Sequence, residues 1–367
     1  MKNIKKINKF IFSAFVLAFM FYIIKYPKIS TDIVLKGLNI CYLVIIPVIF
    51  PFLAFSKMFI NSSLFIFLGR VLNKPARILF GISGEYANAF LIGAIAGFPV
   101  GAKTVKEVYL LNKNINSKNE AERTLAFCNN CSISFAVSVV GITVFNSFII
   151  GLVLFCVQIL SAIITGVVIR FLFEINNPTK QTKTNKQINA AEVNFAEVIS
   201  ESVNGILNVC GTVLFFFIVT NITFEFLKIT PFISDLLDSQ KYAVFSGSVK
   251  SAISGIFEIS SGIYSLVDFN IPMDYKLILS SIILSWSGIS VHFQIIYTLK
   301  SNKLSKLSEL SLKPYFTGKI IHVIISMITT AVIFKFFQTR IIAIAVFAGI
   351  TLFICYLFKE NLKKRKE

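Results

Sequence analysis

Residues 91–103 read LIGAIAGFPVGAK, and this stretch decides how the apolar sequence around it is interpreted. Gly93, Gly97 and Gly101 recur at intervals of four, and Pro99 removes a backbone donor that a regular helix needs. Two interpretations stay open. The segment either packs closely against other helices through its small residues, or forms an unwound hairpin tip whose bare backbone groups face a ligand.

Two interrupted apolar stretches are present, this one over about 87–102 and another over about 242–266. Both contain too much Gly, Ser or Pro for an ordinary membrane span. They predict re-entrant segments, which are tolerated only where protein or water covers the backbone. Residues 62–82 carry basic side chains at spacings of four and three, which predicts a helix lying at the membrane surface.

Long apolar segments surround these stretches. A helix needs about 20 apolar residues to cross a bilayer, and eight segments qualify: 9–25, 38–60, 124–146, 148–173, 203–227, 277–299, 316–337 and 341–358. Of the 367 residues, 55% are hydrophobic and only 15% are charged. This composition excludes a soluble enzyme, a disordered protein and a disulfide-rich secreted domain. The predicted fold is an all-α polytopic integral membrane protein with about eight transmembrane helices and two re-entrant hairpins.

A polar linker at 175–200 divides the chain near its middle. On each side of it the same order recurs: span, re-entrant segment, span, span. The predicted directions are opposite, because 38–60 runs inward and 203–227 runs outward. This order predicts an inverted repeat, in which a secondary transporter holds its site near the bilayer midplane. The expected divisions are an N-terminal helix (1–30), a first repeat (31–174), the linker, a second repeat (201–338) and a C-terminal helix with a basic tail (339–367).

Lys and Arg outnumber Asp and Glu by 36 to 18, and their distribution predicts the orientation. Segments assigned to the cytoplasm carry 24 of them and the opposite segments carry 7, so both termini are expected in the cytoplasm. The remaining five, Lys319 among them, lie within or at the ends of spans, where they can snorkel. The N-terminal apolar stretch has no clear cleavage site, which favours a retained first span over a signal peptide.

Polar side chains gather inside the predicted span 124–146, where residues 128–134 read CNNCSIS. In hydrocarbon such groups need partners, so they are either glue between helices or the lining of a pathway. Asn129 and Asn130 cannot share one helix face, which favours an unwound backbone or a ligand for at least one of them. The two cysteines have neither a second ligand pair nor a soluble redox context, so buried thiols and no metal site are expected.

Glu258 is the strongest candidate for a functional residue in the second interrupted stretch. A carboxylate at mid-bilayer costs on the order of 3 kcal/mol on insertion scales, so it should be paired, protonated or hydrated. Lys250 and Lys103 are candidate partners for a salt bridge that only fixes the hairpin. The other interpretation makes Glu258 a ligand-binding or proton-coupling carboxylate.

Residues 285–294 read SWSGISVHFQ and bring further polar groups into the predicted span 277–299. Trp286 lies in mid-span, which favours packing or stacking over an interface anchor. His292 has two equal interpretations: a hydrogen bond to a neighbouring helix, or proton transfer, because imidazole titrates near physiological pH. The HExxH, P-loop and GxSxG motifs do not occur, so no enzymatic activity is expected. An intramembrane enzyme would need a nucleophile near His292.

Five motifs, in this order and spacing, resemble a known family: GFPVGAK (97–103), AFCNNCSISF (126–135), SGIFEISSGI (254–263), SWSGISVHFQ (285–294) and KPYFTGKIIH (313–322). The first two are similar to the nucleoside-recognition, or Gate, domain. The other three narrow the resemblance to the sporulation integral membrane proteins of the YlbJ type. It covers about residues 30 to 340.

The resemblance implies a role in endospore formation and a fold related to the core of concentrative nucleoside transporters, an inverted repeat with two helical hairpins. Carried over by position, the ligand region comprises Pro99, Gly101, Asn129, Asn130, Ser132, Glu258, Ser260, Ser287 and Gln294. His292 is added to this set because its imidazole can bind or transfer a proton. Where the family often has Pro after the Asn pair, this chain reads Cys131-Ser132-Ile133. A less sharply broken helix is therefore expected there.

The sequence therefore predicts a transporter or permease-like protein of a sporulation-related bacterial membrane. It would move a small polar solute, for example a nucleoside, by alternating access, with Glu258 as the coupling or ligand-binding carboxylate. Expected partners are the lipid bilayer, the solute, a coupling ion or proton, and a second copy of the chain. No cofactor is expected. Nucleic acid is not an expected partner, because the basic residues lie between apolar blocks. The alternative is a structural or assembly factor of the spore envelope without transport activity.

Overall fold

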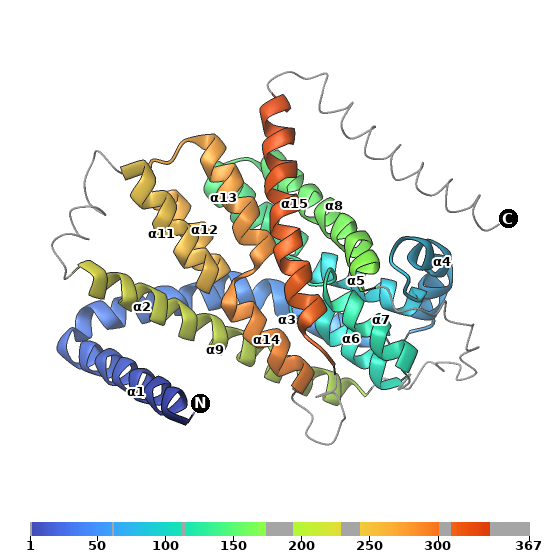
Figure 1. Cartoon of the computed structure of the whole chain (residues 1–367), viewed down its shortest axis with the longest axis horizontal. Helices are drawn as coiled ribbons and strands as arrows, with labels where there is room; N and C mark the ends of the chain where they lie inside the picture. The colour runs from blue at the N-terminus through green and yellow to red at the C-terminus, as the bar shows by residue number, and fades with distance from the viewer. Residues whose placement is uncertain are drawn as a thin grey trace.

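The computed structural model describes residues 2–60, 62–111, 115–173, 194–228, 243–300 and 310–337. All regular structure in these ranges is helical, which confirms the all-α prediction (Figure 1). The first half contains α1 (Lys2–Lys25), α2 (Pro27–Ile40), the π-helix η1 (Cys41–Ile45), α3 (Ile46–Ile60), α4 (Ser63–Leu79), α5 (Gly84–Ala96), α6 (Val100–Leu111), α7 (Ile115–Leu125), the π-helix η2 (Phe135–Val144) and α8 (Phe148–Leu172). The second half contains α9 (Phe195–Lys228), α11 (Ala243–Phe257), α12 (Ile259–Asp268), α13 (Met273–Trp286), α14 (Gly288–Lys300) and α15 (Lys313–Phe337).

The chain is a polytopic membrane protein. Among the described residues, four segments are long and apolar enough to cross a bilayer, and two bent helix pairs raise that number to six. Large apolar side chains are exposed on most of these helices, as expected for an outer surface in contact with lipid. The expected eight spans are not reached in this part of the chain. In α1, the apolar helical stretch Ser13–Lys25 is shorter than a membrane span. The predicted span 341–358 lies outside the described residues.

The predicted span 124–146 is broken in its middle, at the Asn pair, where unwound backbone was expected. Helix α7 ends at Leu125, and η2 begins only at Phe135. Between them the side-chain amides take over helix acceptors: Asn129 Nδ2 donates to the Leu125 carbonyl at 3.2 Å, and Asn130 Nδ2 donates to the Phe127 carbonyl at 2.9 Å. Short polar side chains that bond to nearby backbone compete with helix formation, so the break needs no proline.

The predicted span 277–299 is also interrupted, although it runs on as one candidate membrane segment, Met273–Lys300. Ser287 has a φ of 75° and Gly288 a φ of 83°, both in the left-handed region, which a continuous helix does not enter. The chain therefore ends α13 and starts α14 at this point.

Both interrupted apolar stretches form pairs of helices joined at a break. In the first, Gly97 (φ 84°) and Pro99 separate α5 from α6; in the second, Glu258 separates α11 from α12. A Cβ on Gly262 would lie 2.4 Å from the Gly255 Cα, so the α11 and α12 backbones touch through their glycines. The breaks are where the sequence predicts them. A position inside a bilayer remains a prediction for both pairs.

Two surface predictions have different outcomes. Residues 62–82 contain the expected amphipathic helix, α4, which buries Phe65, Gly69 and Ala76 on one face. The linker prediction for 175–200 is wrong at its end, because α9 begins at Phe195. Asn194 explains this start, since its Oδ1 accepts from the backbone N–H groups of Ala196 and Glu197 at 3.1 and 3.4 Å and caps the helix.

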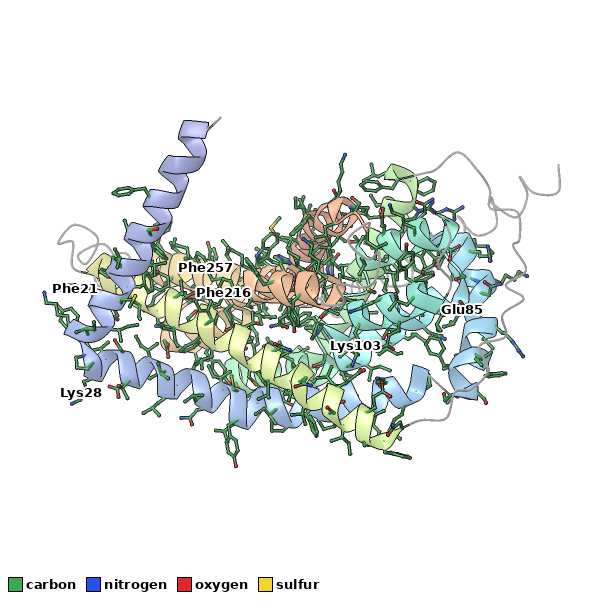
Figure 2. The ribbon with its side chains drawn as sticks, turned by 90° about the horizontal axis from the view of Figure 1, so that it is seen from below. Phe21, Lys28, Glu85, Lys103, Phe216 and Phe257 are labelled. Atoms are coloured by element: carbon green, nitrogen blue, oxygen red, sulfur yellow. The ribbon has the colours of Figure 1, made fainter. Side chains whose placement is uncertain are left out.

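Helix α9 runs alongside α2 and α3, and α1 projects away from the body (Figure 2). The second-half helices α11 to α15 pack on the other side of α9 and against α6 and α8 (Figure 1). The two broken helices thus lie inside the molecule, and Cys128, Cys131 and Leu284 on them are fully buried.

Gly93 provides a test of a close backbone contact in the first half. A Cβ at this position would lie 2.0 Å from the carbonyl oxygen of Cys128, so backbone must shift to admit it. We expect Gly93→Ala to lower the free energy of unfolding by roughly 1–3 kcal/mol through overpacking. Thermal unfolding of the detergent-purified protein measures the change.

Gly211→Ala is the matched control, because nothing lies within 4 Å of a Cβ built on Gly211. That variant should be neutral or more stable by up to about 1 kcal/mol, since alanine favours a helix interior over glycine. Equal unfolding temperatures for the two variants would contradict the close contact at Gly93.

Candidate functional site

The first hairpin packs on the broken helix that follows it. Carbonyl oxygens left without helical partners normally need another hydrogen-bond donor. Here the Cys128 carbonyl lies against Gly93 and Gly101, and a Cβ on either glycine would come within 2.0 or 2.4 Å of it. The Asn129 Oδ1 accepts from the backbone N–H of Ala102 at 2.9 Å. This hydrogen bond ties the start of α6 to the break.

The second hairpin meets the second broken helix in the same manner. A Cβ on Gly288 would lie 3.2 Å from the Glu258 Cα, so the two breaks are in contact. Glu258 is fully buried, and its two carboxylate oxygens accept from the backbone N–H groups of Ser260 at 3.0 Å and Ser261 at 2.6 Å. Glu258 is therefore the N-terminal cap of α12.

The predicted salt bridge of Glu258 is wrong. Lys103 forms an ion pair with Glu201 at 3.7 Å, and Lys250 lies over the rings of Phe224 and Phe269, 5.5 and 5.3 Å from their centroids. The carboxylate is satisfied by backbone donors at the helix N-terminus, where the helix dipole also favours a negative charge. Within the part of the chain that the structure describes, Glu258 is therefore held between α11 and α12 without a cationic partner.

Lys319 on α15 connects the two broken helices. Its ammonium group donates to the Asn129 carbonyl at 2.6 Å, to Ser287 Oγ at 2.9 Å and to the Ser285 carbonyl at 3.2 Å. The side chain is 1% exposed, so the expectation that Lys319 snorkels to an interface is wrong. Asn129 and Ser287, two of the predicted site residues, are thereby brought to one cation.

A sequence pattern that indicates the burial of Lys319 was overlooked. Lys319, His322, Ser326 and Thr330 recur at spacings of three and four, so they form one polar face of α15. All four are buried. A polar face on a helix otherwise surrounded by apolar sequence indicates packing against protein rather than lipid.

That polar face of α15 packs against α8 and α13. Gln158 Nε2 donates to Ser326 Oγ at 2.7 Å and to the Ser281 carbonyl at 3.1 Å, and Ser281 Oγ lies 2.6 Å from Ser326 Oγ. Thr330 Oγ1 donates to Ser281 Oγ at 2.7 Å. The hydroxyls and the amide form a continuous hydrogen-bond network that holds α8, α13 and α15 together on the C-terminal side of Lys319.

His292 lies among aromatic rings on the other side of the second break. Its Nδ1 is 2.6 Å from the Tyr315 hydroxyl, and the rings of Trp286, Tyr315 and Phe316 stand edge-on to it. His292 Nε2 and Asn130 Oδ1 are buried atoms with no hydrogen-bond partner among the described residues. Both predicted residues therefore retain a polar atom that is not used by the fold.

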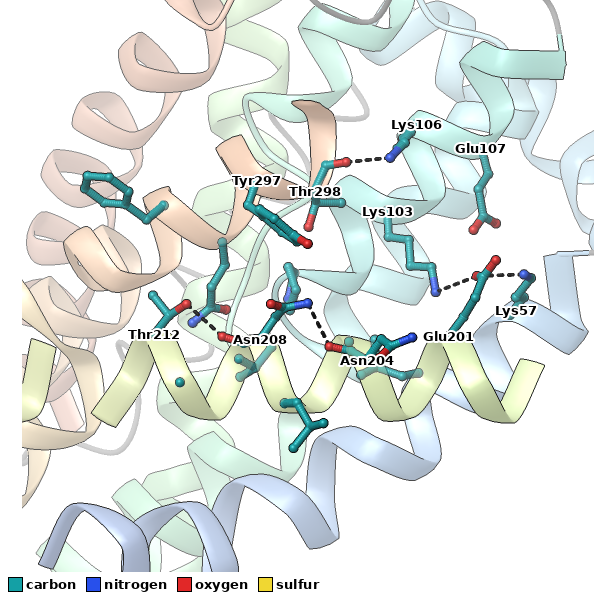
Figure 3. A pocket seen from close by; sticks show the side chains of 18 of the residues that line it. Lys57, Lys103, Lys106, Glu107, Glu201, Asn204, Asn208, Thr212, Tyr297 and Thr298 are labelled. Carbon is teal, nitrogen blue, oxygen red and sulfur yellow. Dashed lines mark hydrogen bonds and ion pairs between the residues drawn. The ribbon is translucent and has the colours of Figure 1, made fainter. Parts of the chain in front are cut away.

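A pocket of about 1110 Å³ lies between the first hairpin and the second half of the chain (Figure 3). Its walls come from α3, the tip and body of α6, α9 and α14. Of the ten predicted site residues, Pro99 and Gln294 line it. The other eight lie in or beside the breaks and do not line this pocket, so the predicted set divides between two places.

Charged residues gather at one end of the pocket and aromatic residues at the other. Glu201 pairs with Lys57 at 2.6 Å and with Lys103 at 3.7 Å, and Lys106 Nζ donates to the Thr298 carbonyl at 2.7 Å (Figure 3). The polar side of α9 supplies Asn204, Asn208 and Thr212, and the aromatic end consists of Phe215, Phe216, Phe293 and Tyr297. Sequence reasoning missed the α9 residues, although their spacing of four places them on one helix face.

Over 356 residues the chain is 23% identical to the sporulation integral membrane protein YlbJ of Bacillus subtilis (strain 168). The chain is a distant homologue of that protein. The match covers 91% of this chain and 84% of YlbJ, so it includes both breaks, both hairpins and the pocket. It confirms the resemblance to YlbJ-type proteins predicted from the motifs. No protein-family model and no solved structure matches the chain, and the nucleoside-recognition domain stays a prediction.

Glu258→Gln tests the capping role of the carboxylate. Glutamine has one acceptor oxygen where Glu258 uses two, so one of the backbone N–H groups of Ser260 and Ser261 loses its partner. We expect a loss of about 1–3 kcal/mol in the free energy of unfolding. Thermal or denaturant unfolding in detergent measures it.

Glu197→Gln is the control, because Glu197 is on the surface of α9, with 61% of its side chain exposed, and forms only a 3.7 Å ion pair with Lys57. Exposed pairs contribute about 0–1 kcal/mol. If Glu258→Gln is no less stable than Glu197→Gln, then capping is not what the Glu258 carboxylate does.

Proposed function

We propose that this chain is a transporter-like membrane protein of endospore formation that moves a small polar solute through the pocket between α6, α9 and α14. The observation that carries the proposal is the pocket itself: polar and charged side chains line a large cavity beside two broken helices. Broken helices beside a polar cavity are typical of secondary transporters. The association with sporulation comes from the likeness to YlbJ.

The same order of elements in the two halves supports this proposal. Each half of the chain has a hairpin, then a broken helix, then a long helix: α5–α6, α7–η2 and α8 in the first, and α11–α12, α13–α14 and α15 in the second. We propose that the halves run in opposite directions through the membrane, with both termini in the cytoplasm, as the Lys and Arg distribution predicts. The pocket then lies between the repeats, where such folds bind solutes.

The lining of the pocket limits the class of solute. Ligand pockets commonly have volumes of about 300–1,000 Å³, so this cavity is large enough for a molecule of nucleoside size. Its polar end would hold hydroxyl, amide or anionic groups, because three lysines face two glutamates there. Its aromatic end would hold a planar or apolar part of the same molecule. A nucleoside combines both features and is one candidate.

The ten predicted residues take two roles in this proposal. Pro99 and Gln294 would contact the solute directly, because they line the pocket. The residues at the breaks, Glu258 and Asn130 among them, would set the conformation of the hairpins and any coupling to an ion or proton. A second copy of the chain remains an expected partner.

Asn208→Trp tests the role of the pocket. Asn208 lies on the pocket face of α9 and is exposed to the cavity, so an indole there fills space without entering the packed core (Figure 3). We expect the chain to restore heat-resistant spore formation in a Bacillus subtilis strain that lacks YlbJ, and Asn208→Trp to leave it at the level of the deletion strain. Membrane abundance should be equal for both. Uptake of labelled uridine into vesicles containing the chain tests the nucleoside directly.

Ile199→Trp is the control on the same helix, because Ile199 is 54% exposed and does not line the pocket. It should restore spores as well as the unchanged chain does. Full restoration by Asn208→Trp would exclude transport through this pocket and favour a structural or assembly factor of the spore envelope.

A further inference from the structure

The oxygen atoms around Lys319 come from the ends of helices. The Ser285 carbonyl is in the last turn of α13, Ser287 lies in the break before α14, and the Asn129 carbonyl follows the end of α7. The last carbonyls of a helix have no intrahelical donor and form the negative end of its dipole. The Ser285 carbonyl at such an end and the Asn129 carbonyl in the unwound backbone beyond α7 converge here on one ammonium group.

Among the described residues, no carboxylate forms an ion pair with Lys319. The titratable groups near it are the Cys128 and Cys131 thiols on the first break, His292 on α14, and Tyr315 and His322 on α15 itself. Each of these is uncharged in its ordinary form at neutral pH or nearly so. The positive charge of Lys319 is therefore balanced by carbonyl and hydroxyl dipoles and not by a counter-charge.

We propose that the two broken helices form a binding site for a monovalent cation, and that the ammonium group of Lys319 is its permanent occupant. Three neutral oxygen atoms that accept hydrogen bonds at 2.6–3.2 Å suit an ammonium ion. Carbonyl and hydroxyl oxygens also suit alkali cations as ligands. Unwound backbone carbonyls and half-helix C-termini are the groups with which transporters of broken helices coordinate Na⁺. In this chain the cation is covalently attached, so the centre holds its charge without an external ion.

The oxygens around Lys319 join the two halves of the chain whether or not a solute passes through the pocket, because other residues line the pocket. A purely apolar contact between the breaks would leave the three oxygens without donors, which is costly in a buried site. A hydrogen-bond donor, and not only the length of the Lys319 side chain, is thus required.

Lys319→Ala tests this by emptying the site of its attached cation. Alanine lacks the three methylene groups and the ammonium beyond them, a fragment equivalent to propylammonium. Thermal unfolding of the purified variant is measured with the chloride of propylammonium, Na⁺, K⁺ or N-methylglucamine. We expect propylammonium or one of the alkali cations to raise the unfolding temperature by roughly 3 °C or more over bulky N-methylglucamine. The unchanged chain should unfold at the same temperature in all four.

Two further variants separate the cation site from general effects of salt. In Lys319→Met the thioether side chain fills the space but donates no hydrogen bond, so this variant should be destabilised and no added cation should restore it. Lys106→Ala removes another buried lysine, whose ammonium donates to the Thr298 carbonyl. Its unfolding temperature should not depend on which cation is present.

Equal unfolding of Lys319→Ala in all four salts would overturn the proposal, and so would the same cation dependence in Lys106→Ala. If Lys319→Ala cannot be purified in any of them, NMR of the unchanged chain with ¹⁵N-labelled lysine side chains decides. The proposal requires a protonated, slowly exchanging ammonium signal that is lost in Lys319→Arg. A neutral amine at that position would overturn it.

Discussion

A buried ammonium group needs several oxygen acceptors, and this need links the two halves of the chain. Lys319 finds its acceptors on Asn129 in the first half and on Ser285 and Ser287 in the second. Removing water from a charge is so costly that it persists only where such partners are fixed in place. Both helices must therefore break at positions where their carbonyls reach α15, and the two hairpins then pack on those breaks.

Close backbone contacts fix each break to its hairpin. Glycines at 93 and 101 allow the Cys128 carbonyl to approach α5 and α6, and Gly255 and Gly262 allow α11 and α12 to touch. In a membrane, where apolar side chains gain little by leaving lipid, small residues and hydrogen bonds supply much of the specificity of helix packing. The same residue types that make these stretches poor spans in the sequence make them good packing surfaces in the fold.

The sequence predicted the breaks in the hairpins and the polar runs, because Gly, Pro and charged residues interrupt apolar periodicity locally. The Asn129–Asn130 pair indicated unwound backbone within 124–146, but not to which carbonyls the two amides donate, since an amide bonding to its own helix leaves hydropathy unchanged. Lys319 was misassigned because a lysine near a helix end can snorkel, and the polar face that it shares with His322, Ser326 and Thr330 was overlooked. That face indicates burial but not the acceptors, because Ser285, Ser287 and Asn129 are remote in the chain and close only in the fold.

The pocket and the oxygens around Lys319 share one element, helix α6. Pro99 and Lys103 at its start line the pocket, whereas the backbone N–H of Ala102 between them donates to Asn129, whose carbonyl accepts from Lys319. A displacement of α6 by a bound solute would therefore act on the Ala102–Asn129 hydrogen bond and, through Asn129, on the ammonium that joins the two breaks. Because the other acceptors of Lys319 belong to α13 and the break that follows it, the effect would reach the second half of the chain without any contact between the solute and Lys319. Hydrogen bonds through Asn129 and the Lys319 side chain thus join the wall of the pocket to the second broken helix.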